Sequence, residues 1–210
     1  MGKKKTTGLF LLFLLSTLLV TGCSKEAVYV PVTTNTVEVT EDGRVIGYMV
    51  ESFDKEYYDI EELESMVRTE IGEYNALNAE EVKDAGRVPV IVNKVTMAED
   101  GSKNVVVALD FQNAAVYTDY MGSELFYGTV EEAIVAGYEV DKKLSKVKSG
   151  DLLTGELLQK HKEAKVLILS GSVSVRMPKS VQFLSANAQL DTNGFVDCTS
   201  GEELKYIIIK

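Results

Sequence analysis

Two pairs of β-rich segments, each joined by an Asp-Gly dipeptide, are the feature that most constrains the fold of this chain. The first pair covers residues 36–40 and 45–53 around Asp42-Gly43, and the second covers residues 88–97 and 104–111 around Asp100-Gly101. Glycine adopts positive φ at such a turn without steric cost, and Asp-Gly between strand-like segments is typical of a β-hairpin. The sequence therefore predicts two antiparallel hairpins.

A helical stripe lies between these hairpins. Its apolar residues recur every three or four positions, as Ile60, Leu63, Val67, Ile71 and Tyr74. This spacing predicts one long amphipathic helix, and we expect its apolar face to pack on the sheet. Asp59 stands just before the stripe and Glu62 follows three residues later, which is an acidic analogue of a capping box.

Short helices and short strands are predicted after the second hairpin. The helices cover residues 113–121, 133–136 behind a Thr129–Glu132 capping box, and 156–162. The strands cover residues 166–169, 173–176, 181–184, 195–198 and 206–209, with Asn193-Gly194 as a further hairpin turn. The predicted fold class is α+β: an antiparallel sheet with one long helix and short helices, followed by a strand-rich C-terminal region.

The first 22 residues have the order of a secretory leader. Three lysines, Lys3 to Lys5, precede an apolar run from Leu9 to Leu19, and the small residue Gly22 stands before Cys23. The alternative is an uncleaved transmembrane helix. The apolar run is short for that role, because crossing a bilayer takes roughly 20 apolar residues. The pattern therefore favours a cleaved signal peptide.

The string Leu18-Leu19-Val20-Thr21-Gly22-Cys23 resembles a bacterial lipobox. This resemblance implies lipidation of the Cys23 thiol, cleavage after Gly22 and acylation of the new amino terminus. It implies a signal peptide over residues 1–22, a lipidated tether over 23–35 and an extracytoplasmic domain over 36–210, and we consider a sub-boundary near residues 160–165. Two acyl chains on one residue anchor stably, so we expect the protein at the extracytoplasmic face of the cell membrane.

The charge of the chain argues against one class of partner. The leader holds three of the 22 basic residues and none of the 32 acidic ones, so the rest of the chain carries 19 bases, 32 acids and a net charge of −13. Nucleic-acid binding requires a basic surface, and we expect no nucleic-acid partner. Lysines gather between Asp141 and Lys165, which suits contact with phosphate-bearing envelope polymers or lipid headgroups, although solvated surface lysines are the simpler explanation.

Tyrosines gather near the ends of predicted elements. They are Tyr57, Tyr58, Tyr117, Tyr120 and Tyr127. A tyrosine ring offers rigid contact area with a polar tip, which suits a ligand groove. Half-buried core packing is the commoner role for the same residues.

No pattern in the sequence predicts a catalytic, metal or cofactor site. His161 is the only histidine and lies between two lysines, which argues against a zinc centre and against a Ser-His-Asp triad. Residues 191–197 resemble the start of a calcium loop but lack its remaining ligands. A hairpin turn at Asn193-Gly194 accounts for the same residues without a bound cation. If Cys23 is lipidated, Cys198 has no disulfide partner, and we expect a buried, inert thiol.

The leader, residues 126–133 and residues 165–175 together resemble a family of uncharacterised surface lipoproteins of anaerobic Gram-positive bacteria. The resemblance implies a location but neither an activity nor catalytic residues. We therefore expect a non-enzymatic binding or interaction module whose partner is an envelope protein or polymer. The alternative is a small carboxylate-based hydrolase of cell-wall polymer, which requires two acids about 5–10 Å apart in a pocket.

Overall fold

The computed structural model describes residues 31–78, 88–140 and 144–210, and residues 31–210 group into one compact unit. Cys23, the leader and the first part of the tether lie outside the described residues, so the predicted cleavage and lipidation stay predictions, as does the proposed domain division. Among the described helices, none is long and apolar enough to cross a membrane.

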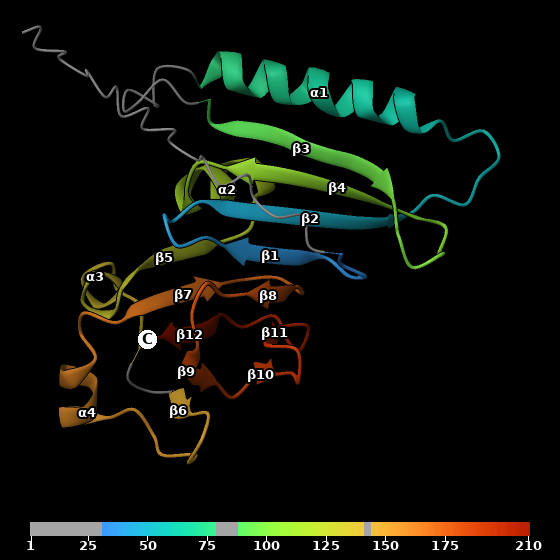
Figure 1. The fold of residues 1–210 in the computed structure, drawn as a ribbon. Helices are drawn as coiled ribbons and strands as arrows, with labels where there is room; N and C mark the ends of the chain where they lie inside the picture. Colours follow the sequence, from blue (N-terminus) through green and yellow to red (C-terminus); the bar gives the residue numbers. More distant parts are fainter. Residues whose placement is uncertain (1–30, 79–87, 141–143) are drawn as a thin grey trace, which may run out of the picture. The chain divides into compact units, whose positions relative to one another are not determined.

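The described residues form two β-sheets and four helices (Figure 1). The strands are β1 (Thr36–Val39), β2 (Val45–Ser52), β3 (Val90–Met97), β4 (Asn104–Phe111), β5 (Leu125–Thr129), β6 (Leu144–Lys146), β7 (Lys165–Leu169), β8 (Ser174–Arg176), β9 (Val181–Ser185), β10 (Gln189–Leu190), β11 (Phe195–Asp197) and β12 (Lys205–Ile209). The helices are α1 (Ile60–Leu77), α2 (Ala114–Met121), α3 (Val130–Val135) and α4 (Gly155–Lys160). The predicted α+β fold class, with one long helix and a strand-rich C-terminal region, is confirmed.

The first sheet has seven strands in the order β10-β11-β8-β1-β2-β4-β3. Its centre consists of the two predicted hairpins, β1–β2 and β3–β4, which join through the β2–β4 pair. Gly43 and Gly101 have φ of 83° and 78°, as their turns require, and Gly194 between β10 and β11 has φ of 87°. All strand pairs of this sheet are antiparallel except β1–β8, which is parallel.

The second sheet has five antiparallel strands in the order β5-β7-β12-β9-β6. The strand-rich C-terminal region is therefore shared between both sheets. Its strands β8, β10 and β11 extend the first sheet, whereas β7, β9 and β12 form the centre of the second. The edges of the second sheet come from β5 and β6, two short strands that the sequence analysis did not predict.

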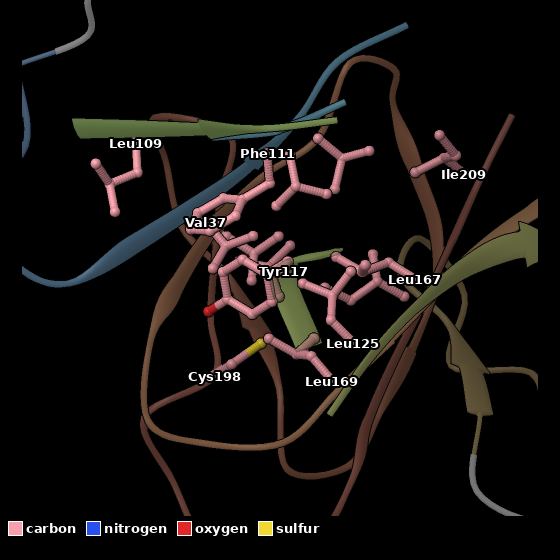
Figure 2. Close-up of a cluster of buried hydrophobic side chains, with 14 of the residues drawn as sticks. Val37, Leu109, Phe111, Tyr117, Leu125, Leu167, Leu169, Cys198 and Ile209 are labelled. Atoms are coloured by element: carbon pink, nitrogen blue, oxygen red, sulfur yellow. The ribbon is translucent and has the colours of Figure 1, made fainter. Parts of the chain in front are cut away.

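The main hydrophobic core lies between the two sheets (Figure 2). Val37, Leu109 and Phe111 of the first sheet face Leu125, Leu167 and Ile209 of the second. Tyr117 of α2 fills the space between them, with its ring edge-on to Phe111 and the ring centroids 5.1 Å apart. A second core lies on the opposite face of the second sheet, where α3 and α4 cover residues such as Val166 and Phe183. The second sheet is thus buried on both faces.

The long helix α1 begins where the sequence predicted and runs three residues further, to Leu77. The Asp59 side chain accepts hydrogen bonds from the backbone N–H groups of Glu61 and Glu62, so it caps the helix as expected. Ile71 is the buried residue of the helix and joins the main core, while Val67 and Tyr74 pack against that core partly exposed. The apolar face of α1 therefore packs on the first sheet, next to β3.

The three short helices also form close to the predicted positions. α2 is capped by the Asn113 side chain and ends at Gly122, which has φ of 64°. α3 begins with a complete capping box, in which the Thr129 hydroxyl accepts from the Glu132 N–H while the Glu132 carboxylate accepts from the Thr129 N–H. Thr129 is also the last residue of β5, so one residue ends a strand and begins a helix.

Candidate functional site

The candidate site is a cleft of about 580 Å³ at the end of the two sheets where the β1–β2 turn, the start of α2 and β5 meet. We call it the end cleft. Its walls also include the first residue of β7, the β8–β9 connection and the end of β12. The lining residues are Glu41, Asp42, Gly43, Asn113, Ala114, Ala115, Leu125, Phe126, Tyr127, Lys165, Pro178, Lys179 and Ile209.

Two lysines give the end cleft its positive charge. Lys165 is the first residue of β7, and its Nζ lies 5.9 Å from the centroid of the Tyr127 ring, at cation–π distance. Lys179 is exposed in the β8–β9 connection. Within the described part of the chain, neither ammonium group forms an ion pair with a carboxylate. Both lysines can therefore bind an anionic group in the cleft, and the charge of Lys165 also acts on the Glu132 carboxylate, whose pKa it helps to lower.

Two consecutive acids, Glu41 and Asp42, lie on the β1–β2 turn at the same cleft. The Asp42 carboxylate accepts hydrogen bonds from the hydroxyl of Thr40 and from the Nε of Arg44. The Thr40 hydrogen bond and the charge of Arg44 hold the pKa of Asp42 below its usual range. Asp42 is thus an ionised acceptor that stabilises its turn, the opposite of a general acid, whose pKa must be raised toward the working pH.

The first turn of α2 adds backbone donors to the end cleft. The Asn113 side chain caps the helix by accepting from the N–H of Val116 at 3.0 Å. Ala114 and Ala115, the first residues of the helix, line the cleft. The N–H groups of a first helical turn have no partner within the helix and carry partial positive charge. This end of α2 therefore reinforces the positive potential of the lysines.

Two aromatic rings from β5 complete the cleft. Phe126 packs toward the second core, whereas Tyr127 packs toward the main core, as the alternation of a strand requires. Burial raises the pKa of the Tyr127 hydroxyl, which stays protonated as a donor. Gly128 keeps this arrangement possible, because a Cβ atom there would lie 2.8 Å from both Phe126 and the carboxylate of Glu132.

The predicted tyrosine cluster separates into different roles. Tyr117 is buried in the main core, and only Tyr127 of the cluster lines the end cleft. Tyr120 donates its hydroxyl proton to Glu70 of α1 at 2.8 Å, and burial together with that bond raises the pKa of Tyr120 to about 12. Tyr57 and Tyr58 lie exposed before α1, where Tyr58 stacks on Phe53 with ring centroids 4.8 Å apart.

Cys198 is fully buried in the main core, near Leu169 (Figure 2). Burial raises the pKa of its thiol to about 12, so the reactive thiolate is suppressed. This placement agrees with the expected buried, inert thiol.

His161 and Asp191 both occupy structural positions. His161 is the C-cap of α4 and stands edge-on to Phe183, with ring centroids 5.0 Å apart. One carboxylate oxygen of Asp191 accepts the N–H groups of Asn193 and Phe195 at 2.8 Å each, which fixes the β10–β11 turn. Across residues 31–78, 88–140 and 144–210, no three His, Cys, Asp or Glu side chains gather in a way that could hold a metal ion. The expectation of no metal and no cofactor remains a prediction.

Comparison with protein-family models, curated proteins and solved structures found no match to this chain. The resemblance to surface lipoproteins therefore rests on the sequence motifs alone.

Proposed function

We propose that this protein is a membrane-anchored extracytoplasmic lipoprotein and a non-enzymatic binding module of the cell envelope, with the end cleft as its binding site. The leader and Cys23 support the location, and the composition of the end cleft supports the role. Lys165, Lys179 and the start of α2 bring positive charge to a cavity that the aromatic residues Tyr127 and Phe126 also line. Ligand sites combine apolar walls with a few polar groups in this way. The partner is an envelope protein or polymer.

The anchoring part of the proposal is tested by Cys23→Ala. In cells fed a labelled fatty acid, the parent protein is expected in the membrane fraction with label, and the variant is expected without label. A Ser24→Ala variant serves as the matched control and should behave as the parent. A Cys23→Ala protein that remains labelled and membrane-bound would show that the lipobox interpretation is wrong.

The binding part is tested by sedimentation of the detergent-solubilised full chain with purified cell walls. We expect the parent to sediment with the walls and the double variant Lys165→Gln/Lys179→Gln to sediment much less. Lys148→Gln removes an exposed lysine that does not line the cleft, so it should bind like the parent. Equal sedimentation of all three proteins would contradict a role for the end cleft.

A carboxylate-based wall hydrolase remains the alternative, because Glu41 and Asp42 line the same cleft. A glycosidase needs one protonated and one ionised carboxyl, and the lowered pKa of Asp42 fits only the ionised one, whose oxygens already accept from Thr40 and Arg44. The wall assay distinguishes the two. Release of soluble fragments that is lost in Glu41→Gln would favour the hydrolase, whereas sedimentation without release favours the binding module.

A further inference from the structure

The edge of β5 that borders the end cleft offers peptide groups for pairing. β5 is the terminal strand of the second sheet and pairs only with β7 among the described strands. Just outside β5, the N–H of Ser170 donates to the carbonyl of Glu124 at 2.9 Å. Hydrogen-bonded and non-hydrogen-bonded positions alternate along an antiparallel pair. Phe126 and Gly128 therefore bond to β7, and the odd-numbered residues of β5 direct their N–H and C=O groups to the outer edge.

Two of the three outward positions already have partners. The Thr118 hydroxyl donates to the carbonyl of Leu125 at 3.1 Å and accepts from the N–H of Leu125 at 2.9 Å. The N–H of Thr129 donates to the carboxylate of Glu132 at 2.6 Å. Between them, the N–H and C=O of Tyr127 have no hydrogen-bond partner among the residues that the structure describes. Tyr127 can therefore form new backbone hydrogen bonds at the strand edge, whereas Leu125 and Thr129 on either side already have partners there.

The end cleft extends around this open position. Phe126 and Tyr127 point to opposite faces of the second sheet, and both line the cleft. Two consecutive residues of the edge strand thus line the cleft, so the backbone that joins them borders it. The backbone of Tyr127 therefore borders the same space as the lysines.

We propose that the end cleft binds an extended peptide that carries a carboxylate. The peptide backbone pairs with the N–H and C=O of Tyr127 as an added strand, and Lys165 and Lys179 bind the carboxylate. This inference rests on the proposed function, because it assigns a ligand class to the same cleft. Since Thr118 and Glu132 close the strand edge on both sides, the paired segment is short: the residue opposite Tyr127 and its immediate neighbours.

The charges of the cleft agree with an anionic ligand. Asp42 and Asp110 share the guanidinium of Arg44, whereas neither cleft lysine forms an ion pair with a carboxylate among the described residues. The charge of Lys165 also acts on the carboxylate of Glu132, while Lys179 has no such partner among the described residues. Two ammonium groups without a direct ion pair favour a ligand that brings a carboxylate.

The open backbone pair favours a peptide over a phosphate polymer. A phosphate group uses cations and N–H donors but offers no N–H to the carbonyl of Tyr127. A peptide residue presents one N–H and one C=O on the same side, which matches both open groups of Tyr127. The ligand chemistry is therefore that of a main chain with an acidic group.

The test uses the peptide acetyl-Ala-Glu-Ala-Ala-amide and amide chemical shifts of the detergent-solubilised full chain. We expect the largest shift at the Tyr127 amide and slower hydrogen exchange there. Replacing the peptide's Glu by Gln should weaken binding severalfold, and N-methylation of the peptide backbone should weaken it about tenfold, the effect of losing one to two hydrogen bonds. The N-methylated peptides require no change to the protein, so they test the pairing without any risk of misfolding.

A matched pair of variants tests the same point from the protein side. Tyr127→Pro and Tyr127→Ala both remove the ring, but only proline removes the outward N–H, which takes no part in the β5–β7 ladder. Their unfolding midpoints report whether both variants fold. We expect the peptide to bind Tyr127→Pro about tenfold more weakly than Tyr127→Ala. Equal affinity of the two variants, or of the N-methylated and unmodified peptides, would overturn the strand pairing.

Inorganic phosphate and glycerol phosphate are tested as alternative ligands in the same amide chemical-shift experiment. If they shift the amides of Lys165 and Lys179 while the peptide shifts nothing, the peptide assignment is wrong but the end cleft remains a ligand site. The wall-sedimentation assay decides the proposed function separately. A chain that binds walls through the two lysines and ignores the peptide refutes this inference alone.

Discussion

The ammonium group of Lys205 donates a hydrogen bond to the carbonyl oxygen of the exposed residue Gly201 over 2.6 Å. The Lys205 side chain is fully buried, and the same Nζ donates to the carbonyl of Gly171 at 2.9 Å. Gly171 lies between β7 and β8, and Gly201 lies just before β12. One side chain therefore holds together two of the connections that lead from one sheet to the other, β7–β8 and β11–β12.

We predict that Lys205→Met destabilises the protein. Methionine fills a similar volume but removes both hydrogen bonds to the carbonyl groups of Gly171 and Gly201, and a hydrogen bond from a charged donor contributes about 1.5–3 kcal/mol when it is buried and less when it is partly exposed. Chemical denaturation with circular dichroism measures the change. Lys160→Met, on an exposed position of α4, is the control and should change the free energy of unfolding by less than about 0.5 kcal/mol. Equal stability of the two variants would mean that the carbonyl groups reach water in solution.

The packing of α1 gives a second prediction. Ile71 is the buried residue of the helix, so Ile71→Ala is expected to lower the free energy of unfolding by about 2–5 kcal/mol. Leu63 is only half-buried, and Leu63→Ala should cost clearly less. Glu73→Ala on the exposed face is the control, with an expected change below about 0.5 kcal/mol. Similar losses for all three variants would show that α1 is rotated relative to its described orientation.

The parts of the fold that the sequence predicts well depend on local chemistry. Asp59 caps α1, Gly122 ends α2, and the Thr129–Glu132 capping box starts α3, each within a few residues of its partners. The Asp-Gly and Asn-Gly turns are equally local. Such signals need no knowledge of the rest of the chain, because the residues that satisfy them are neighbours in sequence.

The parts that escaped prediction depend on distant contacts. β5 consists of five residues between two helices, and it becomes a strand because β7, some 40 residues later, pairs with it. The parallel pairing of β1 with β8 joins residues even further apart, Thr36 with Ser174. The end cleft follows the same rule, since its charged residues come from separate turns and strand ends. In the sequence, Lys165 and Tyr127 belong to separate segments and separate clusters, and nothing there indicates that they lie side by side.

The capping box of α3 gives a prediction about pH. The backbone hydrogen bond from Thr129 holds the pKa of Glu132 below its usual range. A carboxyl with a lowered pKa in the folded state stabilises the protein above its unfolded pKa of about 4.5, and this contribution is lost as the pH falls through the lower folded value. Glu132→Gln removes the charge at every pH.

We therefore expect the parent to unfold at a higher temperature than Glu132→Gln at pH 7, and the difference to shrink as the pH falls below 4.5. Thermal unfolding of both proteins between neutral and acidic pH measures it. Glu131→Gln is a suitable control, because the Glu131 carboxylate pairs with Lys162 and takes no part in the cap. A difference that grows toward acidic pH would reverse the sign of the argument and contradict it.

The β10–β11 turn gives the last prediction, which concerns calcium. One carboxylate oxygen of Asp191 already accepts the N–H groups of Asn193 and Phe195, so this side chain acts as an acceptor for its own turn. We expect Asp191→Ala to destabilise the protein by about 1–2 kcal/mol through the loss of these bonds, with or without calcium.

The calcium test compares unfolding temperatures. A ligand that binds only the folded state, present at 100 times its Kd, would raise the free energy of unfolding by about 2.7 kcal/mol. Millimolar calcium should therefore leave the unfolding temperature of the parent unchanged within a degree or two. Magnesium at the same concentration controls for general salt effects. A rise of several degrees in calcium alone, absent in Asp191→Ala, would identify the turn as a cation site and refute the structural role assigned to Asp191.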